Sequence, residues 1–216
     1  MSAPIHVPSP RLLTRFSKGV MTAYLRAVHG YEIIGLENLP AKPPLLALTN
    51  HVSLLDVPAF AISDPYPDSV FVGKASLMRV PIVGACLRSW GVIPVDRDGQ
   101  DLAAVREIMQ VLREGRMVAA AAEGTRNRQG RLGEVNPVLA RLALGTDAPL
   151  VSVVAIGTYE ALPPGAVFPR PVPIRVVVGP QYDLKHLRSL PKAEATERAR
   201  QIIRERLVEL LPPSMQ

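Results

Sequence analysis

Short apolar runs alternate along the chain with longer segments in which apolar residues recur every three or four positions. The short runs are rich in Val, Ile, Leu and Ala and are bounded by Pro, Gly or charged residues, a pattern typical of buried strands. These runs lie within 31–40 and at 45–49, 69–74, 92–95, 117–123, 149–157 and 173–179. Strands that alternate with helices predict an α/β fold with a mostly parallel central sheet flanked by helices.

The longer segments between the runs have helical periodicity. They predict helices at 10–29, 99–115, 136–145 and 192–211, a helix or broken helix at 77–91, and a helix that starts near residue 56. Residues 99–115 give the clearest pattern, because Leu102, Ile108 and Leu112 share one face and Gly115 ends it. In sheets of this kind, functional residues gather in the loops beyond the carboxyl ends of the strands.

The first helix, at 10–29, combines an apolar stripe with basic residues. The stripe is formed by Leu13, Phe16, Val20, Tyr24 and Val28. A basic amphipathic helix can lie in the interface of an anionic membrane, and it can equally pack on its own domain. The pattern leaves both interpretations open. We expect residues 1–29 to form an N-terminal amphipathic element and residues 30–216 to form one globular domain.

Composition narrows the class of protein. A chain of 216 residues is long enough for one well-buried domain. The net charge of +6 fits nucleic acid, anionic membranes or phosphorylated small molecules as partners, but no nucleic-acid-binding motif is visible. No apolar run is long enough to span a membrane. Cys86 is the single cysteine, which excludes an intrachain disulfide, and its apolar context predicts an inert thiol.

The first candidate for chemistry is the stretch LLALTNHVSLLDVPAF, residues 45–60, where His51 follows a strand and Asp56 comes five residues later. On a continuous helix these two side chains would point about 140° apart. They can meet if His51 lies in a loop and the helix begins near Asp56, as the helix-capping residues Ser53 and Asp56 and the early Pro58 indicate. A carboxylate on one imidazole nitrogen leaves the other nitrogen as a base.

Further polar residues follow other predicted strands. Arg97 lies just after the strand at 92–95, and Lys74 ends the strand at 69–74. The motif Glu123-Gly124-Thr125-Arg126 ends the strand at 117–123, and its glycine permits close backbone approach. Each could be an ordinary solvated turn. Three cations and a possible base at one edge predict a phosphorylated substrate with a reacting hydroxyl.

Four segments in order, NHVSLLD, GVIPVDR, EGTR and PLVSVVAIGTYEALPPG, resemble the four conserved blocks of the glycerolipid acyltransferases. The resemblance is to the 1-acyl-sn-glycerol-3-phosphate acyltransferases and covers roughly residues 30–165. It implies that His51 is the general base and that Asp56 orients it. It also implies that the acceptor phosphate is bound by Arg97, Glu123, Gly124, Thr125 and Arg126, to which we add Lys74.

The resemblance implies transfer of a fatty acyl chain from acyl-CoA or acyl-carrier protein to the sn-2 hydroxyl of 1-acyl-sn-glycerol-3-phosphate, giving phosphatidic acid. We expect no cofactor or metal, because Cys86 stands alone and the histidines of the chain lack ligand spacing. A backbone N–H near the helix start after His51 is a candidate oxyanion donor. We expect a peripheral or monotopic protein on the cytoplasmic face of an anionic membrane, because bacterial members of the family have an N-terminal membrane element where the helix at 10–29 lies.

The sequence departs from the family near the third block. Ala121 and Ala122 replace a common Phe-Pro pair, and GEVNPV replaces a common Phe-Lys-x-Gly stretch, so one expected cation is missing. The acceptor is therefore less certain than the reaction, and a lyso-ornithine lipid or another lysophospholipid is an alternative. A non-catalytic peripheral lipid-binding protein is the alternative from another class, and a nucleic-acid binder is a more distant one.

Overall fold

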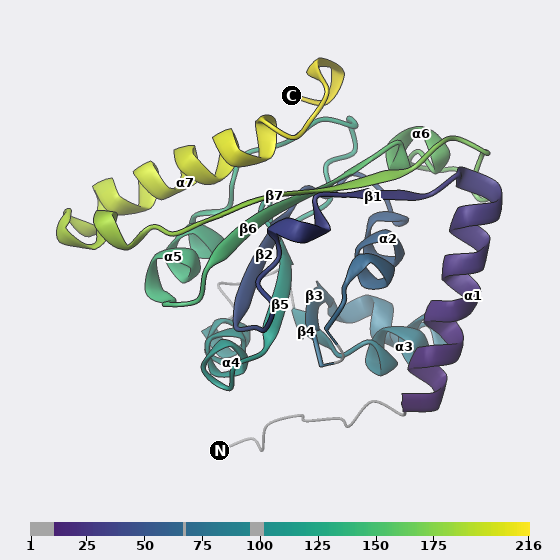
Figure 1. Cartoon of the computed structure of the whole chain (residues 1–216), viewed down its shortest axis with the longest axis horizontal. Coiled ribbons are helices and arrows are strands. Elements are labelled where there is room, and N and C mark those ends of the chain that lie inside the picture. The colour runs from purple at the N-terminus through teal and green to yellow at the C-terminus, as the bar shows by residue number, and fades with distance from the viewer. Residues whose placement is uncertain (1–10, 67, 96–101) are drawn as a thin grey trace.

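The computed structural model describes residues 11–66, 68–95 and 102–216, and in this part of the chain seven strands form one sheet (Figure 1). The strand order is β1-β7-β6-β2-β5-β3-β4, and every pairing is parallel except the antiparallel pair β6–β7. The strands are β1 (Glu32–Ile34), β2 (Leu45–Thr49), β3 (Val70–Lys74), β4 (Val92–Val95), β5 (Met117–Ala121), β6 (Leu150–Ile156) and β7 (Arg175–Tyr182). The expected mostly parallel α/β sheet is confirmed.

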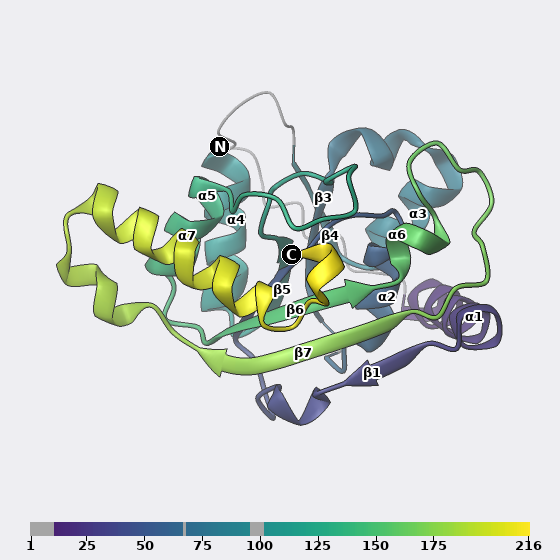
Figure 2. The ribbon, with the colours of Figure 1, turned by 90° about the horizontal axis from the view of Figure 1, so that it is seen from above.

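Helices cover both faces of the sheet (Figures 1 and 2). One face carries α1 (Arg11–His29), α2 (Asp56–Ser63) and α3 (Pro81–Ser89), and the other carries α4 (Leu102–Arg113), α5 (Pro137–Gly145) and α7 (Lys192–Val208). A short helix that the sequence pattern missed, α6 (Thr158–Ala161), follows β6. The 3-10 helices are η1 (Leu36–Asn38), η2 (Ala75–Arg79), η3 (Lys185–Ser189) and η4 (Pro213–Met215). No helix among the described residues has the length and apolar character that crossing a membrane requires.

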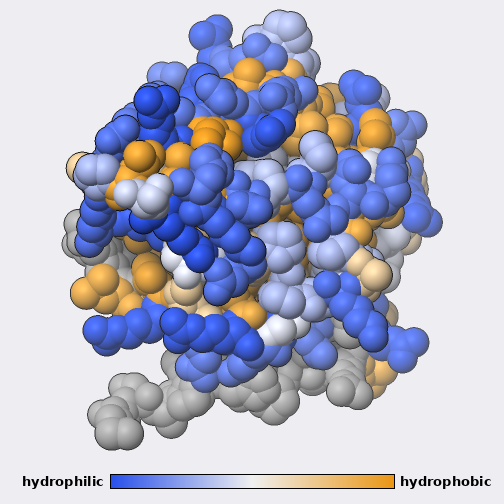
Figure 3. Space-filling view, turned by 60° about the vertical axis from the view of Figure 1, so that its left-hand side comes forward, coloured by the Kyte–Doolittle hydropathy of each residue, from blue (hydrophilic) through white to orange (hydrophobic). Residues whose placement is uncertain are grey.

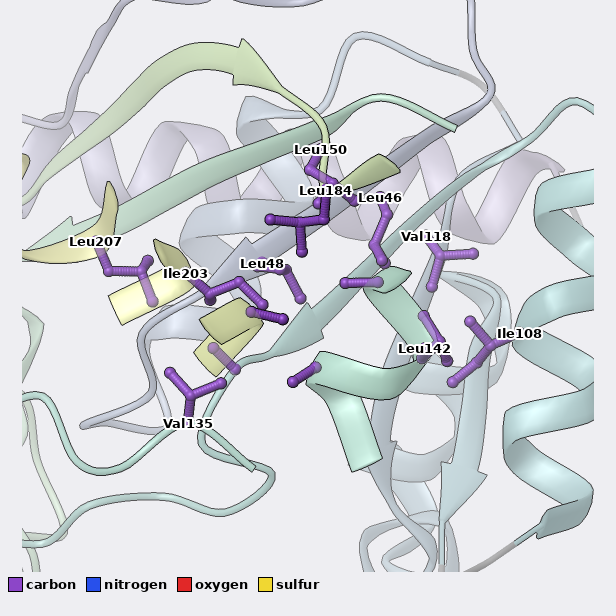
Figure 4. Close-up of a cluster of buried hydrophobic side chains, with 14 of the residues drawn as sticks. Leu46, Leu48, Ile108, Val118, Val135, Leu142, Leu150, Leu184, Ile203 and Leu207 are labelled. Carbon is purple, nitrogen blue, oxygen red and sulfur yellow. The ribbon is translucent and has the colours of Figure 1, made fainter. Parts of the chain in front are cut away.

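The central strand β2 shows how the sheet builds two cores. Its side chains alternate between the faces. Leu46 and Leu48 point toward α4, α5 and α7, whereas Leu45 and Ala47 point toward α1, α2 and α3. Figure 4 shows the first of these cores, in which Leu46 and Leu48 lie among buried side chains from the sheet and the surrounding helices.

The chain turns sharply at a glycine directly after β6. Gly157 has φ +87°, and a Cβ on it would lie 2.0 Å from the carbonyl oxygen of Pro173. Only glycine permits both the backbone angle and this close approach. The turn leads into α6, whose end lies beside the loop after β2, because the Ser53 hydroxyl donates to the carbonyl of Leu162 at 3.1 Å.

Removing a buried side chain from β2 is expected to destabilise the protein strongly. Leu48 is fully buried, so Leu48→Ala should lower the free energy of unfolding by about 2–5 kcal/mol through lost burial and a residual cavity. Leu102→Ala is the matched control, since Leu102 is exposed on α4 and its truncation should cost less than about 0.5 kcal/mol. Urea unfolding followed by circular dichroism measures both, and equal losses would contradict this description of the core.

Candidate active site

The candidate site begins where β2 ends, at a buried asparagine. The side chain of Asn50 donates to the carbonyl of Ala155 at 3.1 Å and accepts from the N–H of Ala155 at 2.9 Å. Asn50 thereby continues the sheet with its side chain, which satisfies both backbone groups of Ala155 in β6. The loop that follows starts from a fixed point.

The side chains of His51 and Asp56 are in contact, as a loop at His51 and a helix that starts near Asp56 predict. Nδ1 of His51 lies 2.9 Å from Oδ2 of Asp56, and α2 begins at Asp56. Asp56 is fully buried, whereas about a fifth of the His51 side chain is exposed. With Nδ1 donating to the carboxylate, Nε2 of the imidazole keeps its lone pair.

Asp56 holds the backbone of the loop as well as the imidazole. Its Oδ2 accepts hydrogen bonds from the N–H of Val52 at 2.7 Å and of Ser53 at 2.8 Å. We expected Asp56 or Ser53 to cap the helix, but Asp56 is the first helical residue and binds backbone groups that precede it. Because a carboxylate accepts several hydrogen bonds at once, one residue closes the loop.

The expectation of an oxyanion donor just after His51 is not met by most of this loop. The N–H of His51 donates to Glu123, those of Val52 and Ser53 donate to Asp56, and that of Asp56 donates to the carbonyl of Ser53. These four backbone groups are engaged inside the loop, so none of them faces a substrate in this arrangement.

The loop after β5 binds both the backbone N–H and the backbone carbonyl of His51. Oε1 of Glu123 accepts from the N–H of His51 at 3.1 Å, and the N–H of Asn127 donates to the carbonyl of His51 at 2.8 Å. Oε2 of Glu123 accepts from the N–H of Gly133 at 3.1 Å. Both oxygens of Glu123 therefore accept hydrogen bonds from backbone N–H groups. This carboxylate supports the backbone of the site and is not open to a substrate.

Burial perturbs Glu123. Desolvation raises the pKa of its carboxyl to about 7, and the hydrogen bonds from His51 and Gly133 only partly offset it. Ionised Glu123 is the form that accepts both backbone N–H groups without a proton of its own in the way. The geometry of His51 is thus coupled to a carboxyl that titrates near neutral pH.

The remaining residues of this motif form the turn itself. Gly124 has φ +70°, and a Cβ on it would lie 2.7 Å from the Asn136 side chain, so glycine is required. Thr125 is exposed and Arg126 is half-buried. None of the carboxylates in the described part of the chain pairs with Arg126, so its guanidinium is available to an anion.

Arg97 and Lys74 are the other two cations that the sequence predicts at this site. Arg97 lies outside the described residues, which resume at Leu102. Lys74 ends β3 and is exposed at the same edge of the sheet as His51, because β3 and β2 are both parallel to β5. One strand separates them, which corresponds to roughly 10 Å.

A family model described as Acyltransferase matches residues 30–156, more than half of the chain and including both loops. The chain belongs to the acyltransferase family. A 1-acyl-sn-glycerol-3-phosphate acyltransferase from Borreliella burgdorferi is 31% identical over 186 residues, which cover 84% of this chain and 72% of the relative. The protein is accordingly an O-acyltransferase.

Other relatives match parts of the acyltransferase to different extents. A chloroplastic 1-acyl-sn-glycerol-3-phosphate acyltransferase from Brassica napus is 30% identical, and the match covers 62% of this chain but only 40% of that protein. The crystal structure of the 1-acyl-sn-glycerophosphate (LPA) acyltransferase PlsC from Thermotoga maritima superposes with a TM-score of 0.69 at 22% identity, covering 93% of this chain and 79% of that chain. That likeness supports the fold.

An apolar crevice lies on the α2 face of the acyltransferase sheet. Ala47, Thr49, Phe60, Phe71 and Val153 are among the residues that line it. His51 is not among them, so this crevice does not form a tunnel that opens on the imidazole.

Several residues that build the acyltransferase site carried no signal that sequence reasoning used. Asn50 lies in the block NHVSLLD and Gly133 begins GEVNPV, but the pattern predicts no role for either residue or for Asn127. They act through contacts with residues far away in sequence, which spacing cannot reveal. Among the described residues, no group of three or more His, Cys, Asp or Glu side chains could hold a metal ion, and Cys86 is half-buried in α3.

Glu123 is expected to make the stability of the acyltransferase depend on pH in a defined direction. Its folded-state pKa of about 7 exceeds the ordinary value, so the folded protein binds more protons than the unfolded chain in the interval between. The free energy of unfolding of the wild type, minus that of Glu123→Gln, should fall by about 1–3 kcal/mol as the pH rises from about 4.5 to 7. Urea unfolding at several pH values measures this difference, and a flat difference would contradict the assignment.

Proposed function

We propose that the protein transfers a fatty acyl chain from an acyl thioester to the sn-2 hydroxyl of 1-acyl-sn-glycerol-3-phosphate, giving phosphatidic acid for phospholipid synthesis. The single observation that carries the proposal is the His51–Asp56 pair, which leaves Nε2 of the imidazole free at the carboxyl edge of the sheet. The names of the relatives from Borreliella burgdorferi and Brassica napus support this acceptor.

The reaction needs one base and no covalent enzyme intermediate. Nε2 of His51 takes the proton from the acceptor hydroxyl as its oxygen attacks the thioester carbonyl. The carbon–sulfur bond breaks, and the departing thiolate takes a proton back from the imidazolium. Asp56 stabilises the transient imidazolium and keeps the ring oriented, while Glu123 and Asn127 hold the His51 backbone.

The acceptor phosphate has a natural place beside this base. Asn127, whose N–H binds the His51 carbonyl, directly follows Arg126 in the chain. Arg126 and the exposed Thr125 would offer a guanidinium and a hydroxyl to the phosphate. Arg97 and Lys74 are proposed as further cations of the same site. A carboxylate at Glu123 would repel a phosphate, so we propose that Glu123 positions His51 instead.

The donor is proposed to be acyl-CoA or acyl-carrier protein, and the protein is proposed to work as a peripheral or monotopic protein on the cytoplasmic face of an anionic membrane. The acceptor is itself a membrane lipid, which supports the location. Transfer to a lyso-ornithine lipid or another lysophospholipid is the second candidate, because GEVNPV replaces the common lysine-containing stretch. A panel of these acceptors with a labelled acyl donor distinguishes the candidates.

Replacement of the base should abolish most of the activity. His51→Ala is expected to lower kcat/KM by about 100- to 10,000-fold, the usual contribution of a general base. His186→Ala is the matched control, because His186 is exposed in η3 far along the chain from the site. Transfer of labelled acyl chain by both variants is measured together with their melting temperatures. A normally folded His51→Ala variant within tenfold of the wild type would overturn the mechanism.

Replacement of the candidate phosphate ligand should weaken binding of the acceptor specifically. Arg126→Ala should raise the KM for 1-acyl-sn-glycerol-3-phosphate by about 10- to 100-fold, the loss of a charge-assisted hydrogen bond, and the KM for the acyl donor little. Arg141→Ala, an exposed arginine on α5, is the control. Initial rates with each substrate varied in turn give both constants, and an unchanged acceptor KM would remove Arg126 from the site.

A further inference from the structure

Helix α1 packs on the domain through both apolar and polar side chains. Leu25 is fully buried, and Met21 and Tyr24 pack against the same core. The indole N–H of Trp90, just after α3, donates to the hydroxyl of Ser17 at 2.9 Å. Lys18 pairs with the buried carboxylate of Asp64 at 3.7 Å. The outer face of α1 meanwhile exposes most of the apolar stripe that its sequence predicts, including Phe16, of which 68% is exposed. Helix α1 thus buries part of its apolar surface in the domain and leaves Leu13, Phe16 and Val20 of the stripe exposed.

The exposed apolar residues are concentrated on a few elements. Among the described residues, the five most exposed large apolar side chains all lie on α1, α3 and the loop after α6. They are Leu12, Phe168, Ile82, Val167 and Phe16. Single exposed apolar residues are ordinary, but a group of them marks an interaction site.

These elements adjoin one another at one end of the molecule. Trp90 joins α3 to α1, and Nδ1 of His29 at the end of α1 lies 2.9 Å from the carbonyl of Val172, where the loop returns to the sheet. Both ribbon views place α1, α3 and the loop after α6 on the right-hand side, opposite α7 (Figures 1 and 2). We call this end, formed by α1, α3 and residues 163–172, the apolar end.

The charge of the apolar end has one sign. Segments 11–31, 69–95 and 163–175 contain no Asp or Glu, although the chain has 19 of them. Their charged residues are Arg11, Arg15, Lys18, Arg26, Lys74, Arg79, Arg88, Arg170 and Arg175. Glu32, Asp68 and Glu160 are exposed just beyond these segments, and Asp96 follows residue 95 in the sequence. The side that carries α7 is mostly hydrophilic, with smaller apolar patches (Figure 3).

The candidate active site borders the apolar end. The hydroxyl of Ser53, two residues after His51, donates to the carbonyl of Leu162, where the loop 163–172 begins. Leu54, in the same turn as His51, leaves half of its side chain exposed. An apolar phase against this end would therefore lie next to the imidazole.

We propose that α3 and the loop 163–172 complete, with α1, a docking face for an anionic lipid bilayer. Val167, Phe168 and Ile82 enter the apolar region, while the surrounding arginines contact the lipid phosphates through side chains whose stems lie along the apolar surface. The proposal rests on the proposed function, since a lipid acceptor would reach His51 from this phase. It assigns membrane contact to two elements besides the N-terminal helix.

A bilayer fits this end better than a protein partner does. The segments of this end carry nine cationic residues and no Asp or Glu, and the carboxylate of Asp64 that pairs with Lys18 is buried, so the charge of this end complements an anionic surface. A second copy of the same end would place these cations against one another and is disfavoured by repulsion.

The test uses the full-length protein and vesicles of phosphatidylcholine with and without phosphatidylglycerol. The double variant Val167→Asp/Phe168→Asp, and separately Ile82→Asp, should lower the affinity for anionic vesicles at least tenfold in co-sedimentation. Leu102→Asp is the matched control, because Leu102 is also exposed but lies on α4. Its affinity should stay within twofold of the wild type, and melting temperatures verify that each variant folds.

Three outcomes would overturn the proposal. Wild-type affinity in both apolar-end variants would exclude α3 and the loop, and an equal loss in Leu102→Asp would exclude a local docking face. Sedimentation velocity that shows a wild-type dimer, lost in the variants without a change in vesicle binding, would assign the end to self-association.

Transfer between short-chain substrates below their micellar concentrations should stay within twofold in all variants. If no variant or wild type transfers an acyl chain, the proposed function fails while vesicle binding still tests the docking face.

Discussion

A single buried oxygen, Oδ2 of Asp56, gathers the imidazole of His51 and the N–H groups of Val52 and Ser53. This arrangement needs a helix that begins at Asp56, because an earlier start would carry His51 around to another direction. It also needs a carboxylate, since no neutral side chain accepts three donors with comparable strength. Burial makes the requirement stricter, because an unpaired donor inside the protein is costly.

The site also requires loops that are distant in sequence to lie side by side, and the sheet brings them together. Parallel strands β2 and β5 end at the same edge, so the loop after β5 can bind both the N–H and the carbonyl of His51. On the other side of β2, Asn50 binds the end of β6. His51 therefore stands between two neighbouring strands, and its position depends on the register of the sheet rather than on its own loop alone.

The surface of the molecule is divided in a way that agrees with a lipid-modifying reaction. The helices on the α7 side present charged side chains of both signs, whereas the end near α1, α3 and the loop 163–172 presents cations and apolar groups. The carboxyl edge with His51 adjoins this second end through Ser53 and Leu162. The Lys18–Asp64 pair and the Trp90–Ser17 hydrogen bond hold polar side chains of α1 inward, while Leu13, Phe16 and Val20 of its apolar stripe remain exposed.

Local pattern determined the strands, the broken helix around Pro81, the start of α2 at Asp56 and the approach of Asp56 to His51, because each depends on residues within a turn or a strand of one another. Four motifs in order also indicated the family, because each motif consists of residues that are neighbours in the sequence. Only the tertiary structure decided that Glu123 supports the His51 backbone, that Asn50 binds β6, and which face of α1 remains exposed. These depend on contacts between residues tens of positions apart, and the burial that raises the pKa of Glu123 exists only once the sheet has brought those segments together.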